Sequence, residues 1–266
     1  MSWKNIKTFL ILLFVIINAY LIFSSGGLIF KKSTVTYINK DTVSDVSKIV
    51  KTNYNVSLSA ESVPSKLENL NNINVTNIIY TDKFKASKHK PDIKGAGFEL
   101  TLKTNTYSYN ETNAGKQVAK ILEEIGIDKN TYRLKTYKAD EGLICNIEQL
   151  SYDYPVFNGT IKAVCVSSKI SLSGTWYIAE NMPKTSSTVK MSDITSVIID
   201  AAGQCAKSDG SKVKITSIDY GYYVTSHDES VVSKSSPAIP CYAVKTDRGL
   251  KYYYDATNGK AIKQED

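Results

Sequence analysis

Residues 115–126 read GKQVAKILEEIG, and the spacing of their apolar residues is that of an amphipathic helix. Four apolar residues fall at positions i, i+3, i+4 and i+7, which places them on one helical face: Val118, Ile121, Leu122 and Ile125. Gly126 follows directly and is suited to end the helix, because glycine adopts a left-handed backbone conformation at little cost. The stretch therefore predicts a helix with one face against a hydrophobic core.

The same spacing returns later in the chain, in the stretch DITSVIIDAAG of residues 193–203. Its apolar face is expected to consist of Ile194, Val197, Ile198 and Ala201. Ser192 is a suitable N-cap residue for this helix, and Gly203 lies near its expected end. Each of the two helices precedes a predicted strand, over residues 132–138 and 213–225 respectively.

Each unit then reaches a proline that we expect to open a strand, because a strand's first residue needs no ladder donor. These prolines are Pro155 in YPVF (residues 154–157) and Pro240 in IPCY (residues 239–242). A predicted strand pair ends each unit: 161–167 with 175–180, and 242–246 with 251–255. The last strand runs into a turn, DATNG, at residues 255–259.

Residues 31–105 carry weaker signals. TVSD at residues 42–45 resembles a capping box, with Asp in place of the usual Glu or Gln, and predicts a helix start. Its apolar residues have helical spacing: Val43, Val46, Ile49 and Val50. A short strand is expected at 56–60, then loops over the polar residues 61–93 with a strand near 77–80. Phe98, Leu100 and Leu102 alternate as in a half-buried strand.

Residues 9–30 are almost wholly apolar. A helix of that length reaches about 33 Å, which exceeds the roughly 30 Å of a bilayer's hydrocarbon core. The alternative is a cleaved signal peptide, but its apolar region is only about 7–15 residues long. An uncleaved anchor is therefore favoured, with the short N-terminus in the cytoplasm and the bulk of the chain outside it.

These signals together predict an α+β fold: one N-terminal transmembrane helix followed by an extracytoplasmic domain of two related helix-plus-antiparallel-sheet units. The predicted divisions are a cytoplasmic N-terminus (1–8), a transmembrane helix (9–30), a membrane-proximal α+β region (31–105), a first helix-sheet unit (106–185) and a second (186–266).

Composition argues against several classes of function. The net charge is +7, but the charges are interspersed, so no nucleic-acid partner is expected. Contact with membrane lipid is expected. Four cysteines stand far apart without a CxxC pair, so zinc is not expected: Cys145, Cys165, Cys205 and Cys241. Two disulfides with three connectivities remain open, and buried free thiols are preferred.

Motifs of known catalytic sites are also missing from the sequence: no GxSxG, HExxH or Gly-rich phosphate loop occurs. His89 and His227 are interpreted as exposed loop histidines, and Glu123-Glu124 as part of a solvated helix face. Tyr252–Tyr254 is expected to alternate between the core and the sheet exterior. No catalytic residue, cofactor or metal ligand is assigned, and an enzyme is not predicted.

Two short motifs carry a family resemblance. The chain begins MSWKNIKT and continues into an apolar segment that contains Asn18, and YPVFN occupies residues 154–158. Trp3, Lys7 and Thr8 match the N-terminal pattern of the YycI (WalI) family, which the chain resembles. The closing stretch, residues 238–259, is similar to PepSY-type modules.

The resemblance implies a non-catalytic regulator at the cell membrane that modulates a WalK/YycG-type sensor histidine kinase of Gram-positive cell-wall homeostasis, with a YycH-like accessory partner. It implies contacts through membrane helices and exterior domains. Trp3 and Asn18 are the candidate partner-binding residues, because a polar amide in hydrocarbon can hydrogen-bond across helices. The alternative is a PepSY-like module that holds a protease or a cell-wall ligand. The direction of regulation, any sensed ligand, and the stoichiometry stay open.

Overall fold

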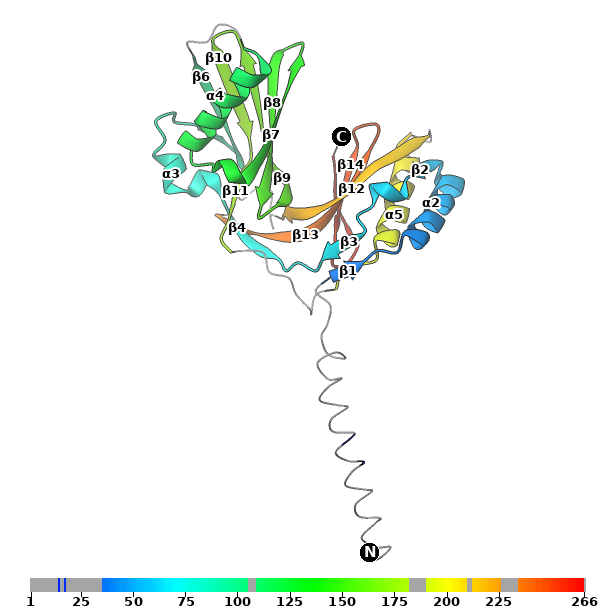
Figure 1. Ribbon diagram of the computed structural model, residues 1–266. Helices are drawn as coiled ribbons and strands as arrows, with labels where there is room; N and C mark the ends of the chain where they lie inside the picture. Colours follow the sequence, from blue (N-terminus) through cyan, green and yellow to red (C-terminus); the bar gives the residue numbers. More distant parts are fainter. Residues whose placement is uncertain are drawn as a thin grey trace, which may run out of the picture.

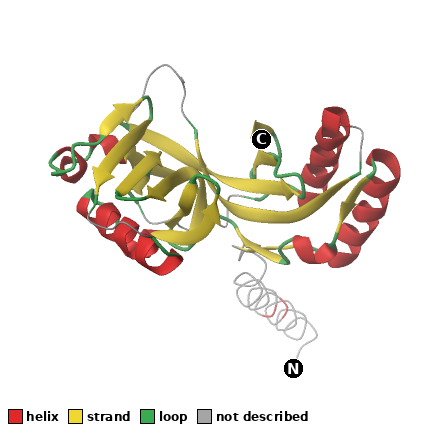
Figure 2. Ribbon diagram, turned by 90° about the horizontal axis from the view of Figure 1, so that it is seen from above, coloured by secondary structure: helices red, strands yellow, loops and turns green. Residues whose placement is uncertain are grey.

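A computed structural model describes residues 14, 17, 35–104, 109–181, 190–209, 212–225 and 234–265. One sheet of 13 strands dominates this part of the chain, and β1 and β3 form a separate two-stranded sheet. Figure 1 shows two lobes that open upward from a shared base. Seen from above in Figure 2, the strands run between two groups of helices at opposite ends.

The elements, in chain order, are β1 (Val35–Tyr37), α2 (Lys40–Tyr54), β2 (Val56–Leu58), η1 (Ala60–Ser62), β3 (Lys66–Glu68), β4 (Ile73–Asn77), η2 (Ile78–Tyr80), α3 (Asp82–Lys85), β5 (Asp92–Lys94), β6 (Gly97–Lys103), α4 (Glu111–Glu124), η3 (Lys129–Thr131), β7 (Tyr132–Ala139), β8 (Gly142–Ser151), β9 (Tyr154–Val166), β10 (Lys169–Gly174), β11 (Tyr177–Ala179), α5 (Ile194–Asp209), β12 (Val213–Val224), β13 (Ser235–Thr246), β14 (Lys251–Asp255) and β15 (Ala261–Glu265).

In the first lobe, α4 packs on one face of the sheet formed by β5 to β10. The apolar face predicted for α4 is buried: Val118 and Leu122 are 0% exposed. Around them lie inward-facing residues of β6, β8, β9 and β10, such as Leu100, Cys145 and Leu172. Because α4 covers only this face, the opposite face of these strands carries the polar residues.

In the second lobe, α2 and α5 lie side by side on β2, β12, β13 and β14 (Figure 1). Val46 and Val50 of α2 and Val197 and Ala201 of α5 belong to one buried cluster with residues of these strands. Burial of aliphatic side chains at about 25 cal/mol per Å² is the main force that holds such helices on a sheet. Each lobe therefore has its own hydrophobic core.

The two lobes share one sheet because β9 and β13 are long. β9 has 13 residues and pairs with β8 and β10 in the first lobe. Its N-terminal part then meets β12 of the second lobe through a parallel bridge between Val156 and Tyr222. β13 pairs with β12 along one side, and with β4 and then β14 along the other.

The α+β prediction is therefore wrong. The described part of the chain is mostly β-sheet, and the two predicted units do not have separate sheets. Two features caused the error. Residues 61–93 contain β4, which pairs with β11 and β13, where the sequence predicted mostly loop. In addition, β8 and β10 supply hairpins that were not predicted.

The sequence also predicted a transmembrane helix over residues 9–30, and the structure does not bear this part of the fold prediction out. Among the described residues, no helix combines the length and the apolar character needed to cross a bilayer. The segment 9–30 lies outside the described residues apart from Phe14 and Ile17, both of which are helical.

Several local predictions are confirmed and others shift. The three long helices are present, and Gly126 follows α4 with φ +102°. The cap of α2 is Asn39 and not Thr42, and Asp193 rather than Ser192 accepts the N–H of Thr195 at the start of α5. β6, β7, β12 and the β13–β14 pair are confirmed. The strand expected near 77–80 is a 3₁₀ turn, and 175–180 contains β11, which pairs with β4 and not with β9.

The two prolines behave differently. Pro155 is the second residue of β9, close to the predicted strand start. Pro240 lies inside β13, between the ladder to β4, which ends at Ala238, and the ladder to β14, which begins at Cys241. Since none of the described strands pairs with Pro240 on that side, the missing N–H costs no ladder hydrogen bond.

Candidate binding groove

The motif at residues 154–158 forms the joint between the two lobes. The side chain of Asn158 bridges β9 to β12 in both directions: its Nδ2 donates to the carbonyl oxygen of Val224 at 2.8 Å, and its Oδ1 accepts from the N–H of Val224 at 3.0 Å. This amide takes the place of a further ladder residue beyond the Val156–Tyr222 bridge. The motif that carries the family resemblance therefore has a structural role here.

Gly221 allows β12 to approach this joint closely. A Cβ atom at this position would lie 2.2 Å from the carbonyl oxygen of Pro155 and 2.7 Å from its Cγ. Both distances are well below van der Waals contact, so only glycine fits without a shift of the backbone. Tyr154 closes the joint on the other side, where its hydroxyl donates to Glu68 at 2.6 Å. Burial, and then this hydrogen bond, raise the pKa of Tyr154 and keep the hydroxyl a donor.

A groove of about 380 Å³ opens beside the joint. Its lining comes from both lobes: β7 and β8 supply one wall, β12, β13 and β14 the other, and Pro155–Phe157 of β9 lie between them. In Figure 1 these strands flank the space between the lobes, with β7 and β8 on one side and β14 on the other. The groove is thus a product of the fold and not of any one segment.

The groove is cationic. Its charged lining residues are Arg133, Lys135, Glu148, Asp219, Lys245 and Lys251, a balance of two positive charges. Two ion pairs cross neighbouring strands: Lys135 Nζ lies 3.5 Å from Glu148 Oε2, and Lys245 Nζ lies 2.8 Å from Asp219 Oδ2. All four side chains are at least 39% exposed, so each pair contributes only about 0–1 kcal/mol. These cations remain available to an anionic partner.

Aromatic packing supports the wall formed by the second lobe. Tyr253 is 2% exposed, and its ring centroid lies 5.1 Å from that of Tyr223 and 5.8 Å from that of Phe157. Tyr252 and Tyr254 point to the opposite face, into the core under α2 and α5. The Tyr252–Tyr254 run therefore alternates between the two faces of β14 as expected, but Tyr253 does not lie on an exposed exterior, because both faces of β14 are covered.

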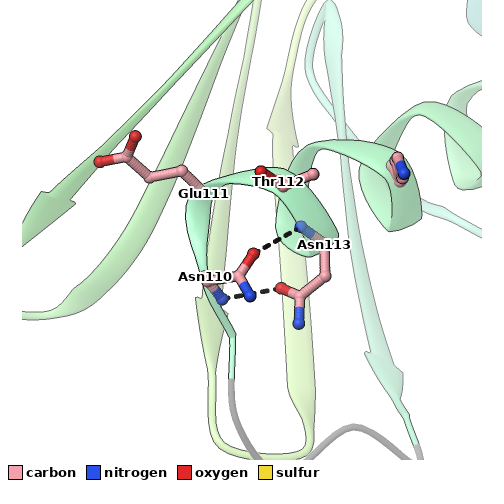
Figure 3. Close-up of a pocket in the computed structure, with 5 residues that line it drawn as sticks. Asn110, Glu111, Thr112 and Asn113 are labelled. Atoms are coloured by element: carbon pink, nitrogen blue, oxygen red, sulfur yellow. Dashed lines mark hydrogen bonds between the residues drawn. The ribbon is translucent and has the colours of Figure 1, made fainter.

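A second hollow lies at the start of α4 and is drawn in Figure 3. Here the amide side chains of Asn110 and Asn113 exchange hydrogen bonds with each other's backbone N–H groups, at 2.9 Å and 2.8 Å. This capping box uses donors that an anion would otherwise bind. The hollow has the features of a capped helix start and not of a binding site.

His89 is not the exposed loop histidine that the sequence indicated. Its side chain is only 14% exposed and contacts the carboxylate of Glu124, which also accepts from Lys88 Nζ at 3.0 Å. The pKa of Glu124 lies below its ordinary value, first because of the hydrogen bond with His89 and then that with Lys88. Glu124 therefore ties α4 to the loop after α3, whereas Glu123 is exposed as expected. His227 lies outside the described residues.

All four cysteines are buried and free, which confirms the preference for unpaired thiols. Cys145 and Cys165 belong to the core under α4. The hydrogen bond with Cys145, and then burial, raise the pKa of Cys165 and hold it as a neutral thiol. Within the described ranges, no group of three or more His, Cys, Asp or Glu side chains could hold a metal ion.

The two residues predicted to bind a partner, Trp3 and Asn18, lie outside the described residues. Sequence reasoning did not identify the groove, because its lining residues come from six strands, several of them far apart in the chain. One signal was present: YPVFN, quoted for the family resemblance, lies directly beside it.

Comparisons with known proteins show only distant structural similarity. No family model matches the chain, and no curated protein matches it. A crystal structure of an uncharacterized protein from Eubacterium rectale is similar, with a TM-score of 0.48 and 9% sequence identity; the match covers 83% of this chain and 98% of that one.

Proposed function

We propose that this chain is a non-catalytic regulatory protein that modulates a sensor histidine kinase of the WalK/YycG type at the cell membrane, with the bulk of the chain outside the cytoplasm and a YycH-like accessory protein as a partner. The proposal starts from the resemblance of the N-terminal motif and of YPVFN to the YycI family. One observation of the structure supports it: YPVFN joins two lobes and borders an open groove lined by both.

The lining of this groove suits the binding of a protein better than chemistry. Neither histidine nor cysteine occurs among the described residues that line it, and its carboxylates are paired with lysines. A cationic, solvent-open groove between two lobes attracts an acidic surface and guides its approach. Binding there can favour one of two arrangements of the partner kinase, which is how a protein without catalytic activity regulates another.

The test is made in cells of the native host. The gene is deleted and restored with the wild-type chain or with one of two double variants, and transcription controlled by the kinase is measured. Lys245→Glu/Lys251→Glu reverses the charge of two lysines that pair across β13 and β14 in the groove. The matched control, Lys103→Glu/Lys169→Glu, reverses the charge of two lysines that pair across β6 and β10, away from the groove.

We expect deletion and the groove variant to change kinase output in the same direction, and the control variant to behave as the wild type. Unchanged output after deletion, with no kinase or YycH-like protein recovered with the tagged full chain, would overturn the proposal. Recovery of a protease instead would favour the PepSY-like alternative.

A further inference from the structure

One wall of the groove ends in an open strand edge. β7 pairs with β8 along its whole length, from Tyr132↔Gln149 to Ala139↔Gly142, and with no other strand of the described chain. In an antiparallel pair, about half of a strand's N–H and C=O groups point away from its partner. The eight residues of β7 therefore present a row of main-chain donors and acceptors at this edge, where the wall ends.

The side chains of this edge select what can pair with it. The sequence of β7, YRLKTYKA, holds three cations and no carboxylate. Such an edge repels a second copy of itself, which is how natural sheets avoid edge-to-edge association. The same charges attract a strand that carries Asp or Glu.

The two faces of β7 define the sequence pattern of that strand. Arg133 and Lys135 are exposed and share the face that lines the groove, opposite Lys251 of β14. Leu134 and Thr136 are half-buried on the other face, toward Gly115 of α4. Because strand side chains alternate between faces, a complementary strand has carboxylates at every second position and apolar residues between them.

We propose that the edge of β7 is a docking site for an extended acidic segment of a partner protein, which adds to the sheet as a strand and turns its carboxylates toward Arg133, Lys135 and Lys251. Main-chain hydrogen bonds supply affinity in this mode, and the side-chain pattern supplies specificity. The inference rests on the proposed function only in taking the partner to be a protein of the sensor system.

The test uses the full chain in a mild non-ionic detergent and a fluorescein-labelled peptide of alternating Glu and Val, about eight residues long to match β7. Fluorescence anisotropy measures its binding. Two further peptides carry N-methyl groups on all Glu or on all Val residues. Since the N–H groups of alternate residues point to opposite edges, only one of these peptides keeps the donors that face β7. We expect that peptide to bind as the parent does and the other to bind at least about tenfold more weakly.

Charge variants supply the second arm. Arg133→Glu/Lys135→Glu is expected to lose binding by at least about tenfold, because two attractive contacts become repulsive. Lys103→Glu/Lys169→Glu, on the far side of the same lobe, is expected to bind normally. Far-UV circular dichroism confirms that both variants fold. All of these positions are exposed.

Three results would overturn the inference: no saturable binding of the parent peptide, equal binding of both N-methylated peptides, or binding of poly(glycerol phosphate) without binding of the peptide. The last result would assign the edge to an anionic polymer. Failure here with altered kinase output in the cell experiment removes only the strand-docking mode. Peptide binding without any effect on kinase output removes only the proposed function.

Discussion

Replacement of Asn158 by Ala tests whether the joint holds the two lobes in one sheet. The substitution removes both hydrogen bonds to Val224, a residue that is itself 5% exposed, so the N–H and C=O of Val224 lose these partners in a buried place. Each such group costs about 1–3 kcal/mol when it is left unsatisfied. Because Asn158 is half-buried and water reaches part of the site, we expect a total loss of about 2–4 kcal/mol.

The assay is urea and thermal unfolding of the full chain, with circular dichroism as the signal that monitors unfolding. For a protein of this size, 1 kcal/mol shifts the midpoint by about 2–4 °C, so the midpoint should fall by about 4–16 °C. Asn146→Ala is the matched control, since Asn146 is exposed on β8 and its amide donates to the hydroxyl of Tyr137 at 3.3 Å. That control should change stability by no more than about 0.5 kcal/mol. Equal stability of the two variants would refute the role given to Asn158.

Three further variants or treatments test neighbouring parts of the account. Gly221→Ala should destabilise by about 1–3 kcal/mol or more, because its Cβ meets Pro155, whereas Gly203→Ala in α5 has room and should be neutral or stabilising in the same unfolding assay. Hydrogen bonds lower the pKa of Glu124, so the stability that this carboxylate contributes is present at pH values above its ordinary pKa of 4.5 and is lost as the pH falls below that. Glu124→Gln should therefore flatten the acid limb of a plot of stability against pH, with an effect under about 1 kcal/mol. Iodoacetamide at pH 8 should leave Cys165 unmodified until the chain is denatured, as mass spectrometry would show, since the hydrogen bond with Cys145 and then burial raise the pKa of this thiol, and burial also makes it inaccessible. Contrary results would be, in turn, a tolerated Gly221→Ala, an unchanged acid limb, and rapid alkylation of the folded chain.

The helices were predictable because their signal is local. Val118 and Leu122 of α4 recur with a period that one segment displays by itself, and the structure buries both. The β13–β14 hairpin was also predicted, whereas the hairpins of β7 with β8 and of β9 with β10 were missed although short turns join those strands as well. The α2 cap was misplaced because Asn39 lies only three residues before the Thr that the sequence favoured.

The shared sheet was not predictable, because strand pairing between distant segments leaves little trace in either one. β4 lies in a polar stretch, and only its pairing with β11 and β13 makes it a strand. The bridge between Val156 and Tyr222 spans two predicted units. The groove was not predictable for the same reason, since Lys135 and Lys251 line one groove only after the lobes are joined.

Site-specific photo-crosslinking tests the central claim, that the groove binds a protein of the sensor system, most directly. A benzophenone amino acid is placed at position 251, in the groove, or at position 103, on β6, in the full chain expressed in its native host. We predict that position 251 crosslinks to the sensor kinase or to the YycH-like protein, and that position 103 does not. Equal labelling from both positions, or no protein adduct from position 251, would contradict the account.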